Sequence, residues 1–401
     1  MATRREMLQL IGGTAALTGL PGLALAAPSV ELRGGERRLV FVFLRGGMDG
    51  LSAVPAYGDP QFAARRGDLA VGAPGTLGGA LDLDGSFGLS PYLAEMHKLY
   101  AARELAVLHA VASPYRERSH FDAQNLLENG TAKPFGRESG WLNAALAAGA
   151  HAVSQSRGLA LGQSIPLVLR GSAHVSSWSP SALPAPDADL LERLAELYRG
   201  DALLARSFAA AREAQGMLEG RDAARGMGGG PQAVVALAKA AGEILGKHDG
   251  PRVASIDFGG WDTHINQLGE YSALTRNLRL LDRSVATLKD ALGTAWRQTA
   301  VLVVTEFGRT VAPNGSSGTD HGTAGAAFVA GGAVRGGRVI ADWPGLGASA
   351  LYEGRDLRPT LDLRSLFKAA LAAQLGLSEA ALESHVFPDS RAVRPLEGLF
   401  A

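Results

Sequence analysis

RLVFVFLRGGMDG, residues 38–50, joins a nearly continuous apolar run to a glycine-rich turn that carries an aspartate. A short apolar run without polar alternation is typical of a strand buried on both faces, as in a parallel sheet covered by helices. Comparable runs recur along the chain between helical segments, and this alternation predicts an α/β fold with a mostly parallel central sheet and helices on both faces. The expected strands are residues 38–44, 105–111, 165–170, 253–257, 300–306 and 326–331.

Leucines and valines at helical spacing predict the helices that cover this sheet. The clearest series consists of Leu274, Leu278, Leu281, Val285, Leu288 and Leu292. A second helix is expected over residues 363–375. Between residues 185 and 250 the chain is alanine-rich and helical, with a glycine-rich joint at residues 226–231. We therefore expect one α/β domain over residues 27–401 that carries a helical insertion at about residues 185–250.

The first residues predict a twin-arginine signal peptide. Arg4 and Arg5 precede a weakly apolar run, and Ala24-Leu25-Ala26 has the small-x-small pattern of a cleavage site. The run is too short and too rich in glycine to span a bilayer comfortably. We expect a signal peptide at residues 1–26, a mature chain that begins near Ala27, passage through the Tat translocase, and a periplasmic or secreted protein. The alternative is an uncleaved N-terminal anchor or a chance basic start.

The overall composition restricts the kinds of partner and chemistry. The 401 residues include 39 Lys and Arg against 39 Asp and Glu, and 46% of them are hydrophobic. Such a chain is globular, and its charge balance gives no reason to expect nucleic acid or an anionic membrane surface as a partner. There is no cysteine, which excludes disulfides, thiolate metal ligands and a cysteine nucleophile. After the N-terminal segment no stretch approaches the length of a membrane span, so no stable span is expected in the mature protein.

Polar residues follow the first two expected strands, at the ends where ligands bind in open α/β sheets. Asp49 lies in the glycine-rich turn after the first strand, as either a turn residue or a cation ligand. Ser119 begins a helical segment after the second strand, as either an ordinary N-cap or a nucleophile that faces unpaired N–H groups. Arg116 and Arg118 lie just before Ser119 and favour an anionic substrate.

Two later loops carry candidate metal ligands. Asp262 and His264 lie two apart in a glycine-rich loop, and together they offer the oxygen and nitrogen ligands that zinc or manganese accepts. Glu306 ends a strongly apolar strand, where a buried carboxylate needs a partner such as a cation. His321 precedes another apolar strand, and Asp320 beside it either ligates the same cation or orients the imidazole. The histidines at positions 97, 109, 151, 174, 248 and 385 are interpreted as surface or structural residues.

In combination, these motifs resemble those of an uncharacterised, mostly Tat-exported bacterial family of the alkaline-phosphatase-like superfamily, which includes phosphatases and sulfatases. The matching stretches are FLRGGMDG (43–50), SHFDAQ (119–124), GWDTH (260–264), TEFGRT (305–310) and GTDHG (318–322). The resemblance implies an alkaline-phosphatase-like fold in which divalent metals flank a serine or threonine at a helix N-terminus, and in which phosphate or sulfate esters are cleaved in line. The residues that it implies for one cation are Asp49, Glu306 and Ser119. Those that it implies for the other are Asp262, His264 and His321.

The sequence departs from the superfamily pattern at three places. Asp262 and His264 are two residues apart, where the superfamily usually spaces such a pair by four. Phe307 follows Glu306 where many members have His or Asn, so either one or two divalent ions are expected. Ala112 occupies the position of the modified residue in formylglycine sulfatases, which argues against that class of enzyme.

These observations lead to three hypotheses. The leading one is an exported, metal-dependent hydrolase of phosphate or sulfate esters of a small molecule or glycan, with Ser119 as the nucleophile and Arg309 or Arg116 holding the substrate. The alternative is a non-catalytic envelope scaffold that keeps one metal site and binds a glycan or protein partner. Two tightly bound cations per chain would favour the hydrolase, and one or none the scaffold. A Ser-His-Asp esterase is disfavoured because no Gly-x-Ser-x-Gly motif occurs.

Overall fold

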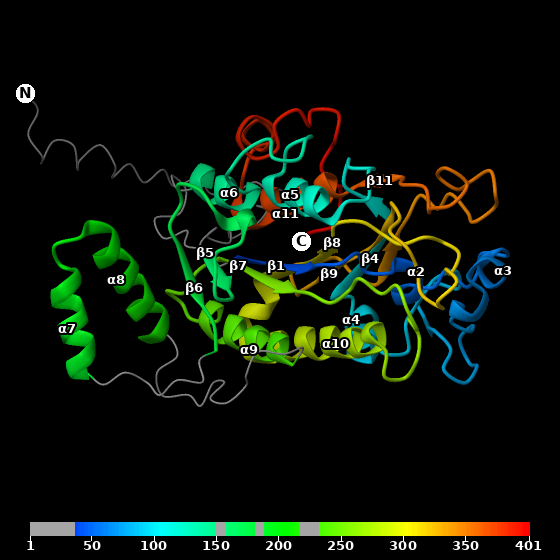
Figure 1. Ribbon diagram of the computed structural model, residues 1–401, viewed down its shortest axis with the longest axis horizontal. Helices are drawn as coiled ribbons and strands as arrows, with labels where there is room; N and C mark the ends of the chain where they lie inside the picture. Colours follow the sequence, from blue (N-terminus) through cyan, green and yellow to red (C-terminus); the bar gives the residue numbers. More distant parts are fainter. Residues whose placement is uncertain (1–36, 150–157, 181–187, 217–231) are drawn as a thin grey trace, which may run out of the picture. The chain divides into compact units, whose positions relative to one another are not determined.

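A nine-stranded sheet lies at the centre of the computed structural model, which describes residues 37–149, 158–180, 188–216 and 232–401 (Figure 1). In spatial order its strands are β10 (Arg338–Ile340), β4 (Leu105–Ala112), β9 (Gly325–Ala330), β8 (Thr299–Thr305), β1 (Arg38–Leu44), β7 (Val253–Phe258), β5 (Gly158–Leu161) and β6 (Val175–Trp178), and β11 (Leu361–Asp362) also pairs with β4. Only β9 runs antiparallel to its neighbours in this sheet of the described chain. A separate pair is formed by β2 (Leu81–Asp82) and β3 (Gly88–Leu89). The mostly parallel sheet confirms the predicted fold class.

The strand predictions at residues 38–44, 105–111, 253–257, 300–306 and 326–331 are confirmed to within one residue. The strand predicted at residues 165–170 is wrong, because the 3-10 helix η3 (Leu167–Leu169) forms there instead. Pro166 has no N–H to give to a ladder, and the Val168 N–H donates to Glu128 Oε1 at 3.2 Å rather than to a strand.

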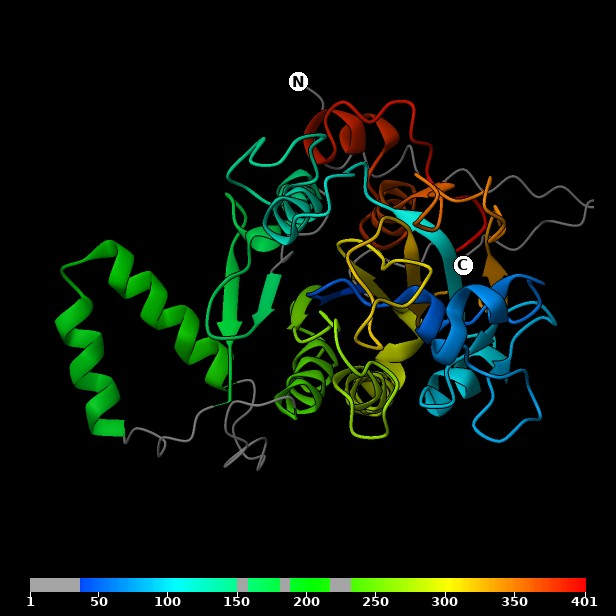
Figure 2. The ribbon, with the colours of Figure 1, turned by 45° about the vertical axis from the view of Figure 1, so that its right-hand side comes forward.

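The two faces of β1 explain why its sequence is apolar throughout. Its successive side chains point to opposite sides of the sheet, so that Val40, Val42 and Leu44 enter one core cluster and Leu39, Phe41 and Phe43 the other. The first cluster packs under α4 (Ala94–Ala101), α9 (Ala233–Leu245) and α10 (Ala273–Leu292). The second packs under α5 (His120–Asn129), α6 (Trp141–Gly149) and α11 (Leu363–Leu375). Figures 1 and 2 show these helices on both sides of the sheet, as predicted.

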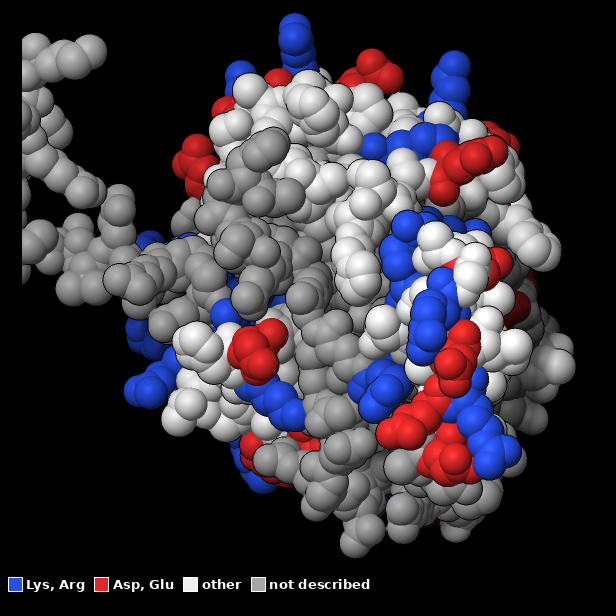
Figure 3. All heavy atoms as spheres, turned by 90° about the vertical axis from the view of Figure 1, so that its left-hand side faces the viewer, with Lys and Arg blue, Asp and Glu red and all other residues white. Residues whose placement is uncertain are grey.

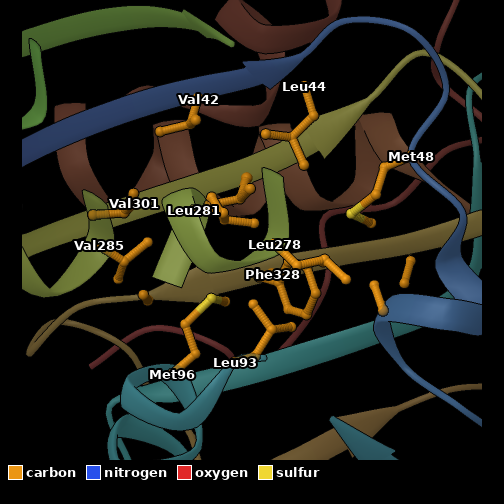
Figure 4. Packing of buried hydrophobic residues seen from close by; sticks show 14 of the residues in the cluster. Val42, Leu44, Met48, Leu93, Met96, Leu278, Leu281, Val285, Val301 and Phe328 are labelled. Carbon is orange, nitrogen blue, oxygen red and sulfur yellow. The ribbon is translucent and has the colours of Figure 1, made fainter. Parts of the chain in front are cut away.

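The predicted apolar face of α10 is confirmed. Leu278, Leu281 and Val285 point from α10 toward Val42 and Val301 of the sheet (Figure 4). Ser272 caps the N-terminus of this helix by accepting a hydrogen bond from the Thr275 N–H at 3.1 Å. The helix predicted at residues 363–375 is confirmed as α11, which Asp362 caps and Gly376 ends in the left-handed conformation.

The remaining helices are short or lie in the region between β6 and α9. They are α2 (Gly50–Ala53), α3 (Phe62–Arg66), α7 (Ala188–Tyr198), α8 (Ala202–Gly216) and α12 (Glu379–Ala381), with η2 (Gly67–Leu69), η4 (Gly293–Gln298) and η5 (Leu382–Val386). The predicted signal peptide at residues 1–26 and the glycine-rich joint at residues 226–231 lie outside the described residues. Within the described ranges, no helix combines the length and apolarity needed to span a membrane. The face drawn in Figure 3 carries basic and acidic side chains next to one another, in keeping with the balanced composition.

The sheet brings four loops to one edge. Leu44, the last residue of β1, is in register with Phe258 at the end of β7 and Thr305 at the end of β8. β4 runs in the same direction as β8, because both are antiparallel to β9 between them. Gly46 (φ +123°) lets the loop after β1 touch the loop after β7, since a Cβ atom there would lie 2.5 Å from the Asp262 backbone nitrogen. The residues singled out from the sequence therefore follow strands that end at a common edge.

Candidate functional site

Three imidazoles surround the carboxylate of Asp262 at this edge. His264 Nε2 lies 2.9 Å and His321 Nε2 3.2 Å from Asp262 Oδ1, and the two nitrogens lie 3.1 Å from each other. On the other side, His120 Nε2 lies 3.4 Å from Asp262 Oδ2. Among the described residues, one group of His, Cys, Asp and Glu could hold a metal ion with ligand atoms all within 4.8 Å, and it consists of His120, Asp262 and His321. His264 adjoins this group through Asp262 and His321.

The outer nitrogen of each imidazole faces an acceptor. His264 Nδ1 lies 3.1 Å from Asp320 Oδ1, His321 Nδ1 lies 3.0 Å from the Arg118 carbonyl oxygen, and His120 Nδ1 lies 2.7 Å from Glu306 Oε1. A neutral imidazole with a proton on Nδ1 presents a lone pair at Nε2. Three Nε2 lone pairs then face the Asp262 carboxylate.

That donor set fits a divalent cation. Lone pairs on nitrogen and oxygen repel one another unless a proton or a metal lies between them. Metal-bound histidines commonly donate their second N–H to a carboxylate or a carbonyl, which is the arrangement of all three imidazoles here. In tetrahedral zinc sites with bonds of roughly 2.0–2.1 Å, neighbouring ligand atoms are separated by about 3.3 Å. The separations among Asp262, His264 and His321 are close to this value.

The loops that carry Asp262 and His321 are tied to each other by backbone hydrogen bonds. The Thr319 N–H donates to the Thr263 carbonyl at 3.2 Å, and the Asn266 N–H donates to the Ser316 carbonyl at 3.0 Å. Asn314 Nδ2 donates to the His264 carbonyl at 3.0 Å and to Asp320 Oδ1 at 3.1 Å. Only glycine at position 318 allows the two loops to lie this close together, since a Cβ atom there would lie 2.1 Å from the His264 carbonyl carbon. The relative placement of the ligands is thus set by the backbone.

The charges at the cluster hold its carboxylates ionised. The pKa of Asp320 is lowered, chiefly by the hydrogen bond from Asn314 and then by His264. Burial acts to raise the pKa of Asp262, but the hydrogen bond and the charge of Arg309 outweigh it and lower that pKa. The pKa of His321 is lowered, first by burial and then by the charge of His120. A neutral His321 next to an ionised Asp262 is the state that a metal ligand pair requires.

Arg309 was predicted to hold the substrate, and the structure places it beneath the cluster. Its buried guanidinium donates from Nη1 to Asp262 Oδ1 at 2.6 Å. Nη2 donates to the Thr319 carbonyl at 2.5 Å and Nε to Thr319 Oγ1 at 3.2 Å. Arg116, the other predicted substrate residue, donates to the carbonyls of Ser113 and Tyr115 in its own loop, and burial lowers its pKa. Both guanidinium groups therefore donate hydrogen bonds to groups of the protein itself.

Asp49, a predicted ligand, is not brought into the cluster. It is buried and accepts hydrogen bonds from the Leu51 N–H, Ser52 Oγ and Gln267 Nε2. Its Oδ2 also lies 2.5 Å from Arg66 Nη2, and both side chains of this ion pair are buried. Burial acts to raise the pKa of Asp49, but Arg66 outweighs it and the pKa is lowered. The protein's own donors occupy this carboxylate.

Glu306, also a predicted ligand, lies behind an imidazole. Its fully buried carboxylate contacts His120 Nδ1, whose ring was not among the residues singled out from the sequence. The signal that could have found His120 is its place directly after Ser119, in a loop that follows a strand. Burial acts to raise the pKa of Glu306, but hydrogen bonds from His120 and Gln124 outweigh it and lower that pKa. The pKa of His120 is raised, first by the same hydrogen bond, which its Nδ1–H donates to Glu306.

Ser119 occupies the N-cap position of α5 without acting as a cap. Its backbone has the extended conformation of an N-cap, with φ −88° and ψ 124°, but its side chain makes no cap hydrogen bond. The residues on either side of it contact the cluster, since the Arg118 carbonyl faces His321 and the His120 ring faces Asp262. Ser119 thus lies at a helix N-terminus between two residues that contact the cluster, and its hydroxyl oxygen does not cap the helix.

A model of the family described as "Protein of unknown function (DUF1501)" matches residues 104–389, a stretch that includes the whole cluster. No curated protein matches the sequence. Solved structures that are similar include Ps i-CgsB in complex with k-i-k-neocarrahexaose, with 10% identity over 90% of this chain and 77% of that chain and a TM-score of 0.44. The PsFucS1 sulfatase from Pseudoalteromonas sp. is 13% identical over 91% of this chain and 71% of that chain, with a TM-score of 0.42. The C-terminal periplasmic domain of EcEptC from Escherichia coli, in complex with Zn, is 10% identical over 74% and 73%, with a TM-score of 0.37.

Proposed function

We propose that this chain, which belongs to the DUF1501 family, is a metal-dependent hydrolase of phosphate or sulfate esters. The observation that carries the proposal is the position of Ser119. Its hydroxyl lies at a helix N-terminus, makes no cap hydrogen bond, and stands between two residues that contact the imidazole cluster. The motifs that resemble those of the alkaline-phosphatase-like superfamily supply the class of reaction.

Each group of residues at the site would have a separate role in the reaction. Asp262, His264 and His321 would hold a divalent cation, zinc or manganese, which when bound lowers the pKa of a hydroxyl and offsets charge on the ester. Ser119 Oγ would attack the phosphorus or sulfur atom, so that the bond to the ester oxygen breaks and the alcohol leaves. The unpaired N–H groups of the first turn of α5 would face the anionic oxygens. Water would then cleave the ester formed on Ser119 and restore the hydroxyl.

The test is hydrolysis by the purified mature chain, supplied with zinc or manganese, of aryl phosphates, phosphodiesters and aryl sulfates. Ser119→Ala is expected to abolish the activity while changing the melting temperature little, because the hydroxyl does not cap the helix and its hydrogen bond with Tyr115 is only partly buried. Ser378→Ala is the matched control, since Ser378 does cap a helix by accepting from the Ala381 N–H. The control should lose about 1 kcal/mol of stability and keep its activity. Activity that survives in Ser119→Ala would rule out the nucleophile.

A non-catalytic scaffold with one metal site is the second candidate, and a specific observation favours it. Asp49 and Glu306, the carboxylates implied for a cation beside Ser119, are both occupied by the protein's own donors. A chain that binds one cation tightly, hydrolyses none of the esters and binds an envelope glycan would support this candidate. Metal analysis together with the hydrolysis assay separates the two.

The proposal includes export. The paired arginines Arg4 and Arg5 and the small-x-small site after them support passage through the Tat translocase into the periplasm or the medium. A chain that must fold around a metal before crossing a membrane suits a route that carries folded proteins. Replacement of both arginines by lysine is expected to leave the protein inside the cell, as cell fractionation would show. Unchanged export of that variant would argue against the twin-arginine route.

A further inference from the structure

The carboxylate of Glu306 is surrounded by donors in a way that suits orientation rather than coordination. Its Oε1 accepts from the Gly46 N–H at 2.9 Å, from His120 Nδ1 at 2.7 Å and from Gln124 Nε2 at 2.8 Å. Its Oε2 accepts from Thr305 Oγ1 at 3.0 Å. The side chain is fully buried. A carboxylate that accepts three hydrogen bonds on one oxygen and shares the Thr305 hydroxyl proton on the other is fixed in place as an anion behind the imidazole.

The His120 ring is fixed by its neighbours as well. It lies on Phe307, with ring centroids 4.7 Å apart and an interplanar angle of 32°, and it meets the edge of His321 at 4.3 Å. In the neutral ring, because Nδ1 faces a carboxylate, the proton belongs on Nδ1 and the lone pair on Nε2. That Nε2 is buried and has no hydrogen-bond partner within the described residues, although it lies 3.4 Å from Asp262 Oδ2. A buried acceptor without a donor is costly, and a cation would satisfy it.

We infer that His120 is a ligand of the cation at the cluster and that Glu306 is the positioning residue that makes it one. Glu306 fixes the Nδ1–H tautomer of His120 and aims Nε2 at the site shared with Asp262 and His321. Phe307, which stands where the superfamily resemblance implies a ligand, supports the His120 ring from beneath. The inference rests on the metal site of the proposed function but assigns two residues that the proposal leaves without a role.

The substitution Glu306→Gln removes the charge and can keep the hydrogen bonds. The amide oxygen of Gln can accept from the three donors that now meet Oε1. Its NH₂ group would face Thr305 Oγ1, which can accept from it while donating to the Leu44 carbonyl at 2.8 Å. A purely structural role for Glu306 therefore predicts little change in this variant, whereas a role in strengthening the imidazole ligand predicts a loss of metal affinity.

The experiment is titration of the metal-free mature chain with zinc by calorimetry. Glu306→Gln is expected to bind zinc about 10- to 100-fold more weakly, the usual effect of losing a partner of a metal-bound histidine. His120→Ala should also weaken binding, and adding Glu306→Gln to it should weaken binding no further, because Glu306 acts through His120. The matched control is Glu128→Gln, since Glu128 is another buried carboxylate of the same edge but contacts Arg45 and the Val168 N–H rather than a histidine. The control should bind zinc as the wild type does.

A second measurement needs no variant. Nitrogen NMR of the histidine rings in the metal-free wild-type chain, at a pH where the His120 ring is neutral, should show its proton on Nδ1, and zinc should shift the Nε2 resonance. A neutral His120 ring with its proton on Nε2, absence of zinc binding, or wild-type affinity in Glu306→Gln would each overturn the inference. Absence of zinc binding would count against the proposed function as well, whereas the other two outcomes are separate from it. If zinc binding depends on Glu306 but no ester is hydrolysed, the inference stands and the proposed hydrolase is wrong. If esters are hydrolysed but zinc binding does not depend on Glu306, the hydrolase stands and the inference is wrong.

Discussion

Acid should destabilise this protein through His109, which is buried at the irregularity of β4. His109 Nε2 lies 2.9 Å from the Val54 carbonyl, and its Nδ1 accepts from the Ala110 N–H at 2.8 Å. These two partners fix a neutral ring with its proton on Nε2, and a second proton on Nδ1 would face the Ala110 N–H. The ring also lies between Phe87 and Trp343, at centroid distances of 5.5 and 5.0 Å. Burial is the largest cause that lowers the pKa of His109 to about 4.

The size of the effect follows from linkage between protonation and folding. In the unfolded chain the pKa of His109 is about 6.5, so between pH 6.5 and pH 4 the unfolded state binds a proton that the folded state does not. Stability is therefore fully present above about pH 6.5 and falls as the pH drops through this window. The difference between about pH 7.5 and pH 4.5 comes to about 2.5 kcal/mol, at about 1.36 kcal/mol for each pH unit in the window.

The assay is urea unfolding of the wild type and of His109→Gln at both pH values. A glutamine side chain can donate and accept as the neutral ring does but does not titrate. It should lower stability at neutral pH through lost packing and remove about 2.5 kcal/mol from the pH dependence. The control is His97→Gln, at a partly exposed histidine on α4. Equal pH dependence in the wild type and His109→Gln would refute the reasoning.

Three further predictions test the site loops and the core. Gly46→Ala should weaken zinc binding at least tenfold, because its Cβ would strike backbone atoms of the cluster loop, whereas Gly259→Ala meets nothing within 4 Å and should bind normally in calorimetry. Asp49→Asn should lower the free energy of unfolding by about 3–5 kcal/mol, since it leaves the buried Arg66 without its counter-charge. Urea unfolding measures this loss, and a clearly smaller change would mean that water stabilises the pair. Phe367→Ala should cost about 3–5 kcal/mol in the same assay, because the ring is buried in the aromatic cluster under α11.

Much of the sheet could be predicted because its strands are buried on both faces. The run at residues 38–44 is apolar at every position after Arg38, so both of its faces must be buried, and it forms β1 with the expected bounds. β5 and β6 could not be recognised, since each has four residues and the sequences GLAL and VSSW lack a strong strand signal. The apolar run at residues 165–170 had the right composition for a strand, but its proline and the contact with Glu128 decide otherwise.

The candidate site was harder to predict than the sheet. Strand-end motifs indicated which loops would meet, because parallel strands expose their carboxyl ends at one edge. They could not indicate how deeply each charged side chain is buried, and burial decides whether that side chain bonds to the protein itself or is available to a ligand. Asp49 and Arg309 lie deep enough to bond with other buried groups, whereas Asp262 is partly exposed. His120 was missed because its partner, Glu306, is distant in sequence and becomes its neighbour only in the fold.

The charge of the cluster bears on what it can bind. The lowered pKa values of Asp262, Asp320 and Glu306 keep three negative charges there at neutral pH. Arg309 supplies one positive charge, and a protonated His120 would supply a second, so the balance stays negative. An anionic ester would be repelled by such a site, whereas one divalent cation, bound with His120 neutral, would cancel its net negative charge. Inorganic phosphate should therefore bind only to the zinc-loaded chain, and binding of equal strength to the metal-free chain would show that the attraction comes from elsewhere.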